Sequence, residues 1–247
     1  MSARPEQTLV VIPTYNEAES LPGVVDRVLA ALPTIAVLVV DDASPDGTGD
    51  IADALAARHP GVSVLHRTAK EGLGPAYIAG FDWGVAHGFE WLVEMDADGS
   101  HRPEQLPDLL VQAGPHRLVL GSRWVPGGAI VNWPWHRSVL SRSASVYSRV
   151  LLGLPQRDVT AGFRVLPAAA PRELDLAGAE SHGYCFQIDV LRRAVAAGYE
   201  IVEMPITFVE RGLGRSKMDL GIILEAMCRV TLWGMERLDP RPRRTLR

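Results

Sequence analysis

Short apolar runs alternate with helical patterns through the first half of the chain. Five runs predict buried strands, at residues 8–12, 35–40, 62–65, 91–95 and 117–120. Helical patterns follow the first three runs, over residues 17–32, from Asp46-Gly47-Thr48 to about residue 58, and from the loop 70–74 to about residue 87. Near-continuous apolar strands separated by helices are typical of a parallel sheet covered on both faces, so we expect an α/β fold.

The second half is less regular. Gly127, Gly128, Pro134 and three nearby tryptophans predict a mobile loop, and further patterns predict helices at 139–152, 189–197 and 218–238 and a strand at 200–205. We expect one catalytic domain over residues 8–213, followed by an apolar or amphipathic helix over 214–238 and a basic, disordered tail over 239–247.

Composition narrows the class of protein. The chain has 247 residues, and its formal net charge of -4 gives no reason to expect nucleic-acid binding. Its two cysteines, Cys185 and Cys228, have no metal-type spacing and fit a reducing compartment. The polar start lacks the apolar core of a signal peptide, and no apolar run reaches the ~18 residues of a membrane span. These features predict a soluble or peripheral cytoplasmic protein.

The first sign of chemistry is a pair of carboxylates, Asp96 and Asp98, directly after the fourth apolar run. Unpaired charges at the end of a buried strand are destabilising, so such groups usually meet a cation or a polar ligand. Carboxylate oxygens are hard ligands that suit Mg²⁺ or Mn²⁺. The spacing therefore indicates a metal that in turn holds phosphate groups.

Other polar residues follow the remaining strands. In an open parallel sheet ligands bind beyond the carboxyl ends of the strands, so one rim collects acids, a tyrosine and cations: Pro13, Tyr15, Glu17, Asp41, Asp42, Arg67, Lys70, Ser122 and Arg123. Each alone has an ordinary explanation as a turn, a cap or a surface charge, but the collection on one edge favours a binding site.

Several familiar sites are absent from the sequence. No Gly-x-Gly-x-x-Gly follows the first strand, there is no phosphate-binding Gly-Lys-Ser/Thr loop, the histidines lack zinc spacing, and Ser122 lacks a nucleophile elbow. These absences argue against a dinucleotide enzyme, a P-loop enzyme, a zinc enzyme and a serine hydrolase.

Six motifs in order resemble glycosyltransferase family 2, in the branch of dolichol- or polyprenol-phosphate mannose synthases. They are Val-Ile-Pro-Thr-Tyr-Asn-Glu at 11–17, Val-Val-Asp-Asp-Ala-Ser-Pro-Asp-Gly-Thr at 39–48, Met-Asp-Ala-Asp at 95–98, Gly-Ser-Arg at 121–123, Asp-Val-Thr-Ala-Gly-Phe-Arg at 158–164 and Arg-Gly-Leu-Gly-Arg-Ser-Lys at 211–217. The first three are shared across the family, and the whole set is specific to the branch. The resemblance implies a GT-A fold, a mostly parallel sheet flanked by helices.

The resemblance also implies roles for matching residues. Asp98 is the principal metal ligand with Asp96 beside it, and Ser100, where the family often places a glutamine or serine, is a weaker third ligand. Arg137 and Ser141 match the family's acceptor-phosphate pair, and Asp98, Arg123 and Arg137 are the catalytic candidates. The donor nucleotide-sugar would contact Pro13, Tyr15, Glu17, Val40, Asp42, Lys70, Asp96, Ala97, Asp98, Arg123, Arg211 and Lys217.

The implied reaction moves mannose from GDP-mannose to a polyprenyl phosphate with Mg²⁺ or Mn²⁺ and inverts the anomeric centre to a β-linked product. Asp42 and Glu17 do not by themselves distinguish guanine from uracil, so a UDP-sugar hexosyltransferase is an alternative. A more distant alternative is a non-catalytic module that binds nucleotide-sugar or lipid phosphate.

The lipid acceptor implies peripheral attachment to the cytoplasmic face of the membrane. The apolar C-terminal helix has two interpretations: it packs on the domain, or it lies in the membrane interface with Trp233 at headgroup level. A separate membrane-anchoring protein is a third route to the same location.

Overall fold

The computed structural model describes residues 3–179, 184–210 and 220–238. Its centre is a seven-stranded sheet with the strand order β3-β2-β1-β4-β7-β5-β8. The strands are β1 (Thr8–Thr14), β2 (Ala36–Asp41), β3 (Val62–His66), β4 (Trp91–Glu94), β5 (Arg117–Ser122), β7 (Arg164–Pro167) and β8 (Glu200–Pro205). All neighbours pair in parallel except β7, which is antiparallel to both β4 and β5. The predicted α/β fold with a mostly parallel sheet is confirmed.

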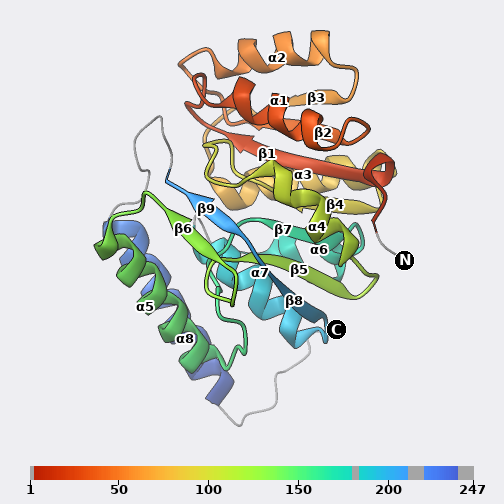
Figure 1. Cartoon of the computed structure of the whole chain (residues 1–247). Helices are drawn as coiled ribbons and strands as arrows, with labels where there is room; N and C mark the ends of the chain where they lie inside the picture. The colour runs from red at the N-terminus through yellow and green to blue at the C-terminus, as the bar shows by residue number, and fades with distance from the viewer. Residues whose placement is uncertain (1–2, 180–183, 211–219, 239–247) are drawn as a thin grey trace.

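Helices cover both faces of this sheet (Figure 1). They are α1 (Leu21–Ala31), α2 (Thr48–Arg58), α3 (Leu73–Ala86), α4 (Leu106–Val111), α5 (Trp135–Leu152), α6 (Ala170–Glu173), α7 (Tyr184–Ala196) and α8 (Leu220–Leu238), with short 3₁₀ turns at Pro5–Gln7, Pro103–Gln105 and Leu176–Gly178. Along β1, Val10 and Ile12 face one core, whereas Leu9 and Val11 face the other. A strand buried on both sides is why its sequence is continuously apolar.

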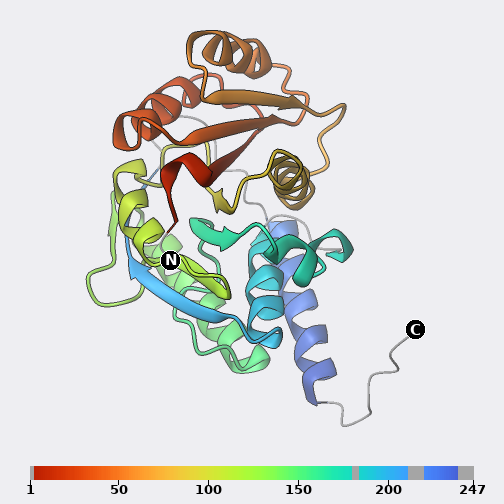
Figure 2. The same cartoon turned by 90° about the vertical axis from the view of Figure 1, so that its right-hand side faces the viewer.

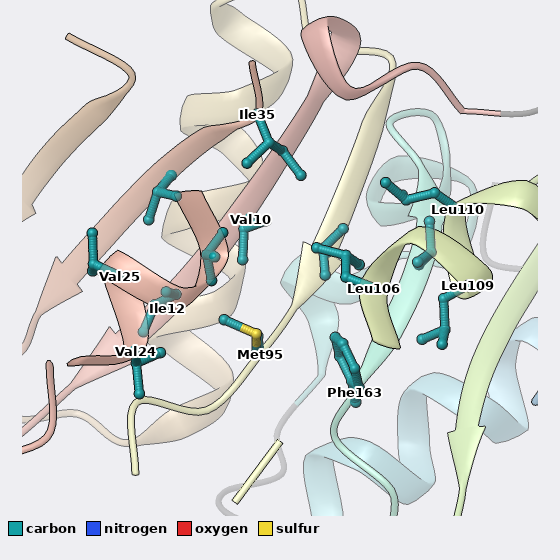
Figure 3. Packing of buried hydrophobic residues seen from close by; sticks show 14 of the residues in the cluster. Val10, Ile12, Val24, Val25, Ile35, Met95, Leu106, Leu109, Leu110 and Phe163 are labelled. Atoms are coloured by element: carbon teal, nitrogen blue, oxygen red, sulfur yellow. The ribbon is translucent and has the colours of Figure 1, made fainter. Parts of the chain in front are cut away.

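The first core lies between the sheet and helices α1, α2 and α4. Figure 3 shows Val24 and Val25 of α1 beside Ile12, and Leu106, Leu109 and Leu110 of α4 near Phe163. The second core holds α3 and α7, together with a few residues from α5 and α8, of which Leu152 and Val230 are fully part of the buried cluster.

Helix α3 lies very close to the sheet because of two glycines. A Cβ on Gly80 would lie 2.4 Å from Val11 Cγ1, and one on Gly84 would lie 2.7 Å from Leu92 Cδ2. The side of α3 that contacts β1 and β4 therefore has no room for side chains at these two positions, which fixes the start of α3 relative to the strand ends.

Four local predictions were wrong. The helix predicted at 189–197 begins earlier, at Tyr184 (α7). The helix predicted at 17–32 begins at Leu21, because the Glu17 backbone N–H is held by Thr48 Oγ1 at 3.0 Å and the chain turns before the helix starts. The loop predicted around residues 127–135 contains β6 (Ala129–Val131), which pairs in parallel with β9 (Thr207–Val209), and α5 begins at Trp135 instead of residue 139. The antiparallel strand β7 was not predicted. Strand pairing to distant residues leaves no local signal.

Helices α5 and α8 lie side by side at the end of the molecule opposite α2, in both Figure 1 and Figure 2. Val230 of α8 is buried, and the half-buried Trp233 stacks with Arg192, whose guanidinium carbon lies 4.7 Å from the ring centroid. Trp233 therefore packs in part against the protein, and its placement at lipid headgroup level stays a prediction. Within the described residues no helix is long and apolar enough to cross a membrane.

The predicted domain boundary at 213–214 and the tail at 239–247 fall outside the described residues. The division of the chain into a catalytic domain, a C-terminal helix and a tail stays a prediction.

Candidate functional site

The carboxyl ends of β1 and β2 are joined by hydrogen bonds between their following loops. The backbone N–H of Asn16 donates to Ser44 Oγ at 3.1 Å, and that of Ala18 donates to Asp46 Oδ2 at 3.2 Å. Asn16 and Ala43 have left-handed backbone conformations, with φ of 56° and 54°. Two non-glycine residues in this strained region, one on each loop, mark a backbone that is held in shape by its surroundings.

Three residues that were predicted to bind the nucleotide-sugar lie together at this edge of the sheet. The buried Asp42 pairs with Arg67 and accepts the backbone N–H groups of Glu71 and Gly72 at 3.3 Å each. These contacts tie the loop before α3 to the end of β2. On that loop Lys70 places its ammonium 4.1 Å from the Tyr15 ring centroid.

Four other residues that were predicted to bind the nucleotide-sugar have different surroundings. Glu17 is half-buried, and its Oε2 accepts the Ser20 hydroxyl at 2.9 Å. Pro13 is half-buried opposite Val40 in the β1–β2 register. The Val40 and Ala97 side chains lie in the hydrophobic cores, so only main-chain atoms of these two residues remain to face a nucleotide.

The loop after β4 carries the predicted metal ligands. Asp96 and Asp98 are partly exposed, and the backbone N–H of Ser100 donates to Asp98 Oδ1 at 3.0 Å in a turn that Gly99 completes with φ of 75°. Ser100 is 1% exposed, and its Oγ has no hydrogen-bond partner among the described residues. The Ser100 hydroxyl and the carboxylates of Asp96 and Asp98 together form a set of hard oxygen ligands that fits Mg²⁺ or Mn²⁺.

No group of three or more acidic, histidine or cysteine side chains with metal-binding geometry occurs in the described part of the chain. Mg²⁺ in proteins is usually bound by one or two carboxylates together with substrate phosphates and water, and Asp96 and Asp98 provide two carboxylates for such an arrangement.

A buried ion pair lies beneath this loop. Glu94 at the end of β4 and Arg164 at the start of β7 are both fully buried, with Arg164 Nε 3.8 Å from Glu94 Oε2. Burial raises the pKa of Glu94 to about 7, although the Arg164 guanidinium acts in the opposite direction. The Tyr77 hydroxyl donates to Asp96 Oδ1 at 3.4 Å, so the metal-site loop rests on buried polar groups.

Arg123 is held by the carboxylate of Asp158, a residue that was not among those predicted at the sheet edge. Its backbone N–H, Nε and Nη2 all donate to the fully buried Asp158, at 2.7–2.9 Å, and Nη2 also donates to Thr160. The guanidinium lies 5.2 Å from the Phe208 ring centroid and 5.6 Å from that of Trp133. Asp158 thus fixes the fork of Arg123 within the site, and phosphate binding by Arg123 stays a prediction.

The predicted acceptor residues lie on the first turns of α5. Arg137 forms an ion pair with Glu210 at the end of β9 and lies 5.9 Å from the Trp133 ring centroid. Ser141, one turn further along the helix, lines the same cavity as Arg137. The predicted residues Arg211 and Lys217 lie outside the described residues.

One cavity of about 930 Å³ joins the metal-site loop to α5 and α8. Its lining includes Asp96, Asp98, Ser100, Arg123 and Arg137 and the apolar residues Val139, Leu140, Val146, Ile188, Ala226, Met227 and Val230. The polar residues Ser141, Arg142, Ser143, Tyr147 and Ser148 of α5 also line it. The predicted donor residues of β1, β2 and the loop before α3 do not line it. The structure therefore separates the predicted site into a nucleotide side at the strand ends and a cavity side between the helices, with Asp96 and Asp98 where they meet.

Sequence reasoning missed four residues of this arrangement: Asp158, His101, Glu94 and Glu210. Asp158 begins one of the quoted motifs, Glu94 directly precedes another, and His101 lies three residues after it, so these three residues had a local signal. Glu94 and Glu210 acquire their roles only through contacts with Arg164 and Arg137, far away in the sequence.

Comparison with known proteins agrees with these observations. The glycosyl transferase family 2 profile matches residues 9–173. The chain is 56% identical over 243 residues to the polyprenol monophosphomannose synthase of Mycolicibacterium smegmatis, covering 96% of this chain and 91% of that protein. It is 57% identical over 229 residues to the undecaprenyl-phosphate mannosyltransferase of Micrococcus luteus, covering 93% of this chain and 94% of that protein.

Solved structures share the fold at lower identity. Glucosyl-3-phosphoglycerate synthase from Mycobacterium tuberculosis, in complex with Mn²⁺, UDP-glucose and phosphoglyceric acid, has a TM-score of 0.62 at 18% identity, with coverage of 93% of this chain and 79% of that chain. A mannosyltransferase from Pyrobaculum calidifontis, in complex with GDP-mannose and Mn²⁺, has a TM-score of 0.57 at 18% identity, with coverage of 95% and 65%. These similarities confirm the GT-A fold.

Proposed function

The chain belongs to glycosyl transferase family 2, and on this basis we propose that it transfers mannose from GDP-mannose to a polyprenyl phosphate. The observation that carries the proposal is a cavity lined both by Asp96, Asp98 and Arg137 and by apolar side chains of α5 and α8. A lipid phosphate needs both a cation for its head and an apolar surface for its chain, and the lining of this cavity offers the two together.

The chemistry requires two anions to be brought together. Asp98, Asp96 and Ser100 would hold Mg²⁺ or Mn²⁺. When bound, the cation would act as a Lewis acid that stabilises the negative charge of the departing diphosphate. Arg137 offers the acceptor phosphate a planar fork of donors. The phosphate is already anionic near neutral pH, so the transfer needs no strong general base. Positioning and fixed charge supply the catalysis, and in-line attack gives a β-linked product.

Helices α5 and α8 would contact the membrane surface. Exposed apolar side chains recur along one side of α5, at Trp135, Val139, Val146 and Val150, and also along α8, at Leu224, Met227, Leu232 and Met235. Val139, Val146 and Met227 are both exposed and part of the cavity lining, so the cavity opens among these side chains. An opening ringed by apolar side chains fits a lipid surface, and we assign the protein to the periphery of the cytoplasmic leaflet.

The test is transfer of labelled mannose from GDP-mannose to undecaprenyl phosphate in detergent micelles, followed by organic extraction. We expect label in the organic phase with Mn²⁺, none with EDTA, and recovery when Mn²⁺ is restored. Label from UDP-glucose but not from GDP-mannose would favour the UDP-sugar hexosyltransferase. Binding of GDP-mannose with no lipid product under any metal condition would favour the non-catalytic module.

A further inference from the structure

The loop after β4 turns back toward Asp96, its second residue. The turn at Asp98 and Gly99 reverses the chain, so that His101 lies beside Asp96, five residues earlier. The backbone N–H of Asp96 donates to His101 Nδ1 at 3.2 Å, and His101 Nε2 lies 3.8 Å from Asp96 Oδ2. One imidazole ring therefore contacts both the main chain and the carboxylate of the same aspartate.

Packing fixes the plane of this ring. His101 is 3% exposed, stacks on Phe163 with centroids 5.1 Å apart and planes at 15°, and meets Phe208 edge-on at 5.7 Å. A Cβ on Gly162 would lie 3.7 Å from His101 Cε1 and 3.8 Å from Asp96 Oδ2, so the Gly162 backbone lies next to both groups. The two aromatic contacts hold the buried ring in its plane beside Asp96.

The hydrogen bond also selects the tautomer. Because Nδ1 accepts the Asp96 backbone N–H, the proton of the neutral ring is on Nε2, the nitrogen that faces the Asp96 carboxylate. The other carboxylate oxygen, Oδ1, accepts the Tyr77 hydroxyl. Asp96 thus has fixed groups against its backbone and against both of its oxygens.

We propose that His101 is a positioning residue that holds the backbone and carboxylate of Asp96 in the orientation needed to bind the divalent cation next to Asp98 and Ser100. The proposal rests on the metal-dependent transfer proposed above. His101 acts through Asp96, in the way that partners of metal ligands orient those ligands in other sites, where their loss weakens metal binding about 10- to 100-fold.

Conservative variants separate the two contacts. In His101→Asn the side-chain oxygen can replace Nδ1 as the acceptor of the Asp96 N–H, whereas His101→Gln places its polar end near Nε2 and leaves that N–H without an acceptor. His101→Ala removes both contacts. The exposed His116, on the loop before β5, supplies the control variant His116→Asn.

The measurement is the affinity of the full chain for Mn²⁺ in the presence of GDP, with free Mn²⁺ detected by its EPR signal. Melting temperatures of all variants are recorded without metal. We expect a 10- to 100-fold weaker Mn²⁺ affinity for His101→Ala. We also expect a similar loss for His101→Gln, a clearly smaller loss for His101→Asn, and no change for His116→Asn. A residue with only a packing role would lower the melting temperature and leave Mn²⁺ affinity of the folded protein unchanged, and that result would overturn the proposal.

The outcomes also separate this proposal from the proposed function. If His101→Ala does not fold, the comparison of the Asn and Gln variants decides, because equal Mn²⁺ affinities for those two would overturn the proposal. If the parent protein transfers no mannose yet its Mn²⁺–GDP binding follows the expected order, the positioning role stands and the proposed transfer falls.

Discussion

The two sides of the site are built in opposite ways. On the nucleotide side, parallel strand ends and main-chain hydrogen bonds fix the buried carboxylate of Asp42, which accepts two backbone N–H groups and pairs with Arg67. On the cavity side, α5 and α8 present exposed apolar side chains, and Arg137 at the start of α5 forms an ion pair with Glu210.

The contrast follows from the two substrates that we propose. A nucleotide-sugar is small and polar, so a fixed arrangement of donors and acceptors can match it. A polyprenyl phosphate brings one charged group and a long apolar chain, so it needs a single cation and an open apolar surface. Variants on the nucleotide side should therefore affect the chemical step or folding, and variants on the cavity side should affect use of the lipid.

The largest expected effect is at the boundary between the two sides. Asp98→Ala removes the principal metal ligand, and since a bound cation contributes several kcal/mol to stabilising the departing diphosphate, we expect kcat to fall by about a thousandfold or more. Mannose transfer at saturating Mn²⁺ measures this loss. Asp108→Ala on the exposed side of α4 is the control, because it removes a carboxylate far from the cavity lining. Near-parental activity of Asp98→Ala at high Mn²⁺ would remove Asp98 from the metal site.

The second effect concerns stability on the nucleotide side. Because burial raises the pKa of Glu94 to about 7, the folded protein keeps this proton at pH values where the unfolded chain has lost it. The Glu94 contribution to stability is then fully present below pH 4.5 and is lost as the pH rises toward 7.

Glu94→Gln removes this titration. Relative to the parent, its free energy of unfolding should increase between pH 4.5 and 7 by at most roughly 3 kcal/mol and then stay level. Urea unfolding of both proteins across this range gives the difference. A difference that is constant with pH would mean that Glu94 titrates normally in the folded state.

The same contrast explains what the sequence could predict. On the nucleotide side, continuous apolar runs such as Val10–Ile12 defined the strands, and parallel strands place their carboxyl ends at one edge, so Tyr15, Asp42 and Lys70 could be assigned to one region. Local pattern and site were linked by a general property of parallel sheets.

The cavity side depends on contacts that no local pattern contains. Strand β6 exists because Ala129–Val131 pairs with Thr207–Val209, and Arg123 is oriented by Asp158 from a different loop. The sequence showed that the helix α8 is rich in apolar residues. Only the packing of Val230 and Trp233 in the structure shows which of these residues face inward. The surface that we propose to face the lipid could therefore be identified only from the fold.

A smaller effect is expected at Arg137. Arg137→Ala removes a charged donor for the acceptor phosphate, and hydrogen bonds to charged groups contribute about 1.5–3 kcal/mol, so KM for undecaprenyl phosphate should rise about 10- to 100-fold. Binding of GDP-mannose, measured by calorimetry with Mn²⁺, should stay within about twofold of the parent. Arg58→Ala, an exposed arginine of α2, is the control. Loss of GDP-mannose binding in Arg137→Ala, with lipid KM unchanged, would move Arg137 to the nucleotide side.

The smallest effect tests the lipid surface without touching the cavity. Val150 of α5 and Met235 of α8 are 73% and 64% exposed and do not line the cavity, so Val150→Ser with Met235→Ser should reduce binding to vesicles with anionic lipid by about tenfold through lost apolar burial. Vesicle flotation measures the bound fraction. The control replaces the exposed Val85 of α3 and Val111 of α4 by serine and should float like the parent. If the parent does not float, or if both double variants float equally well, α5 and α8 are not the attachment surface, and a separate anchoring protein becomes the better explanation for how this transferase reaches its lipid.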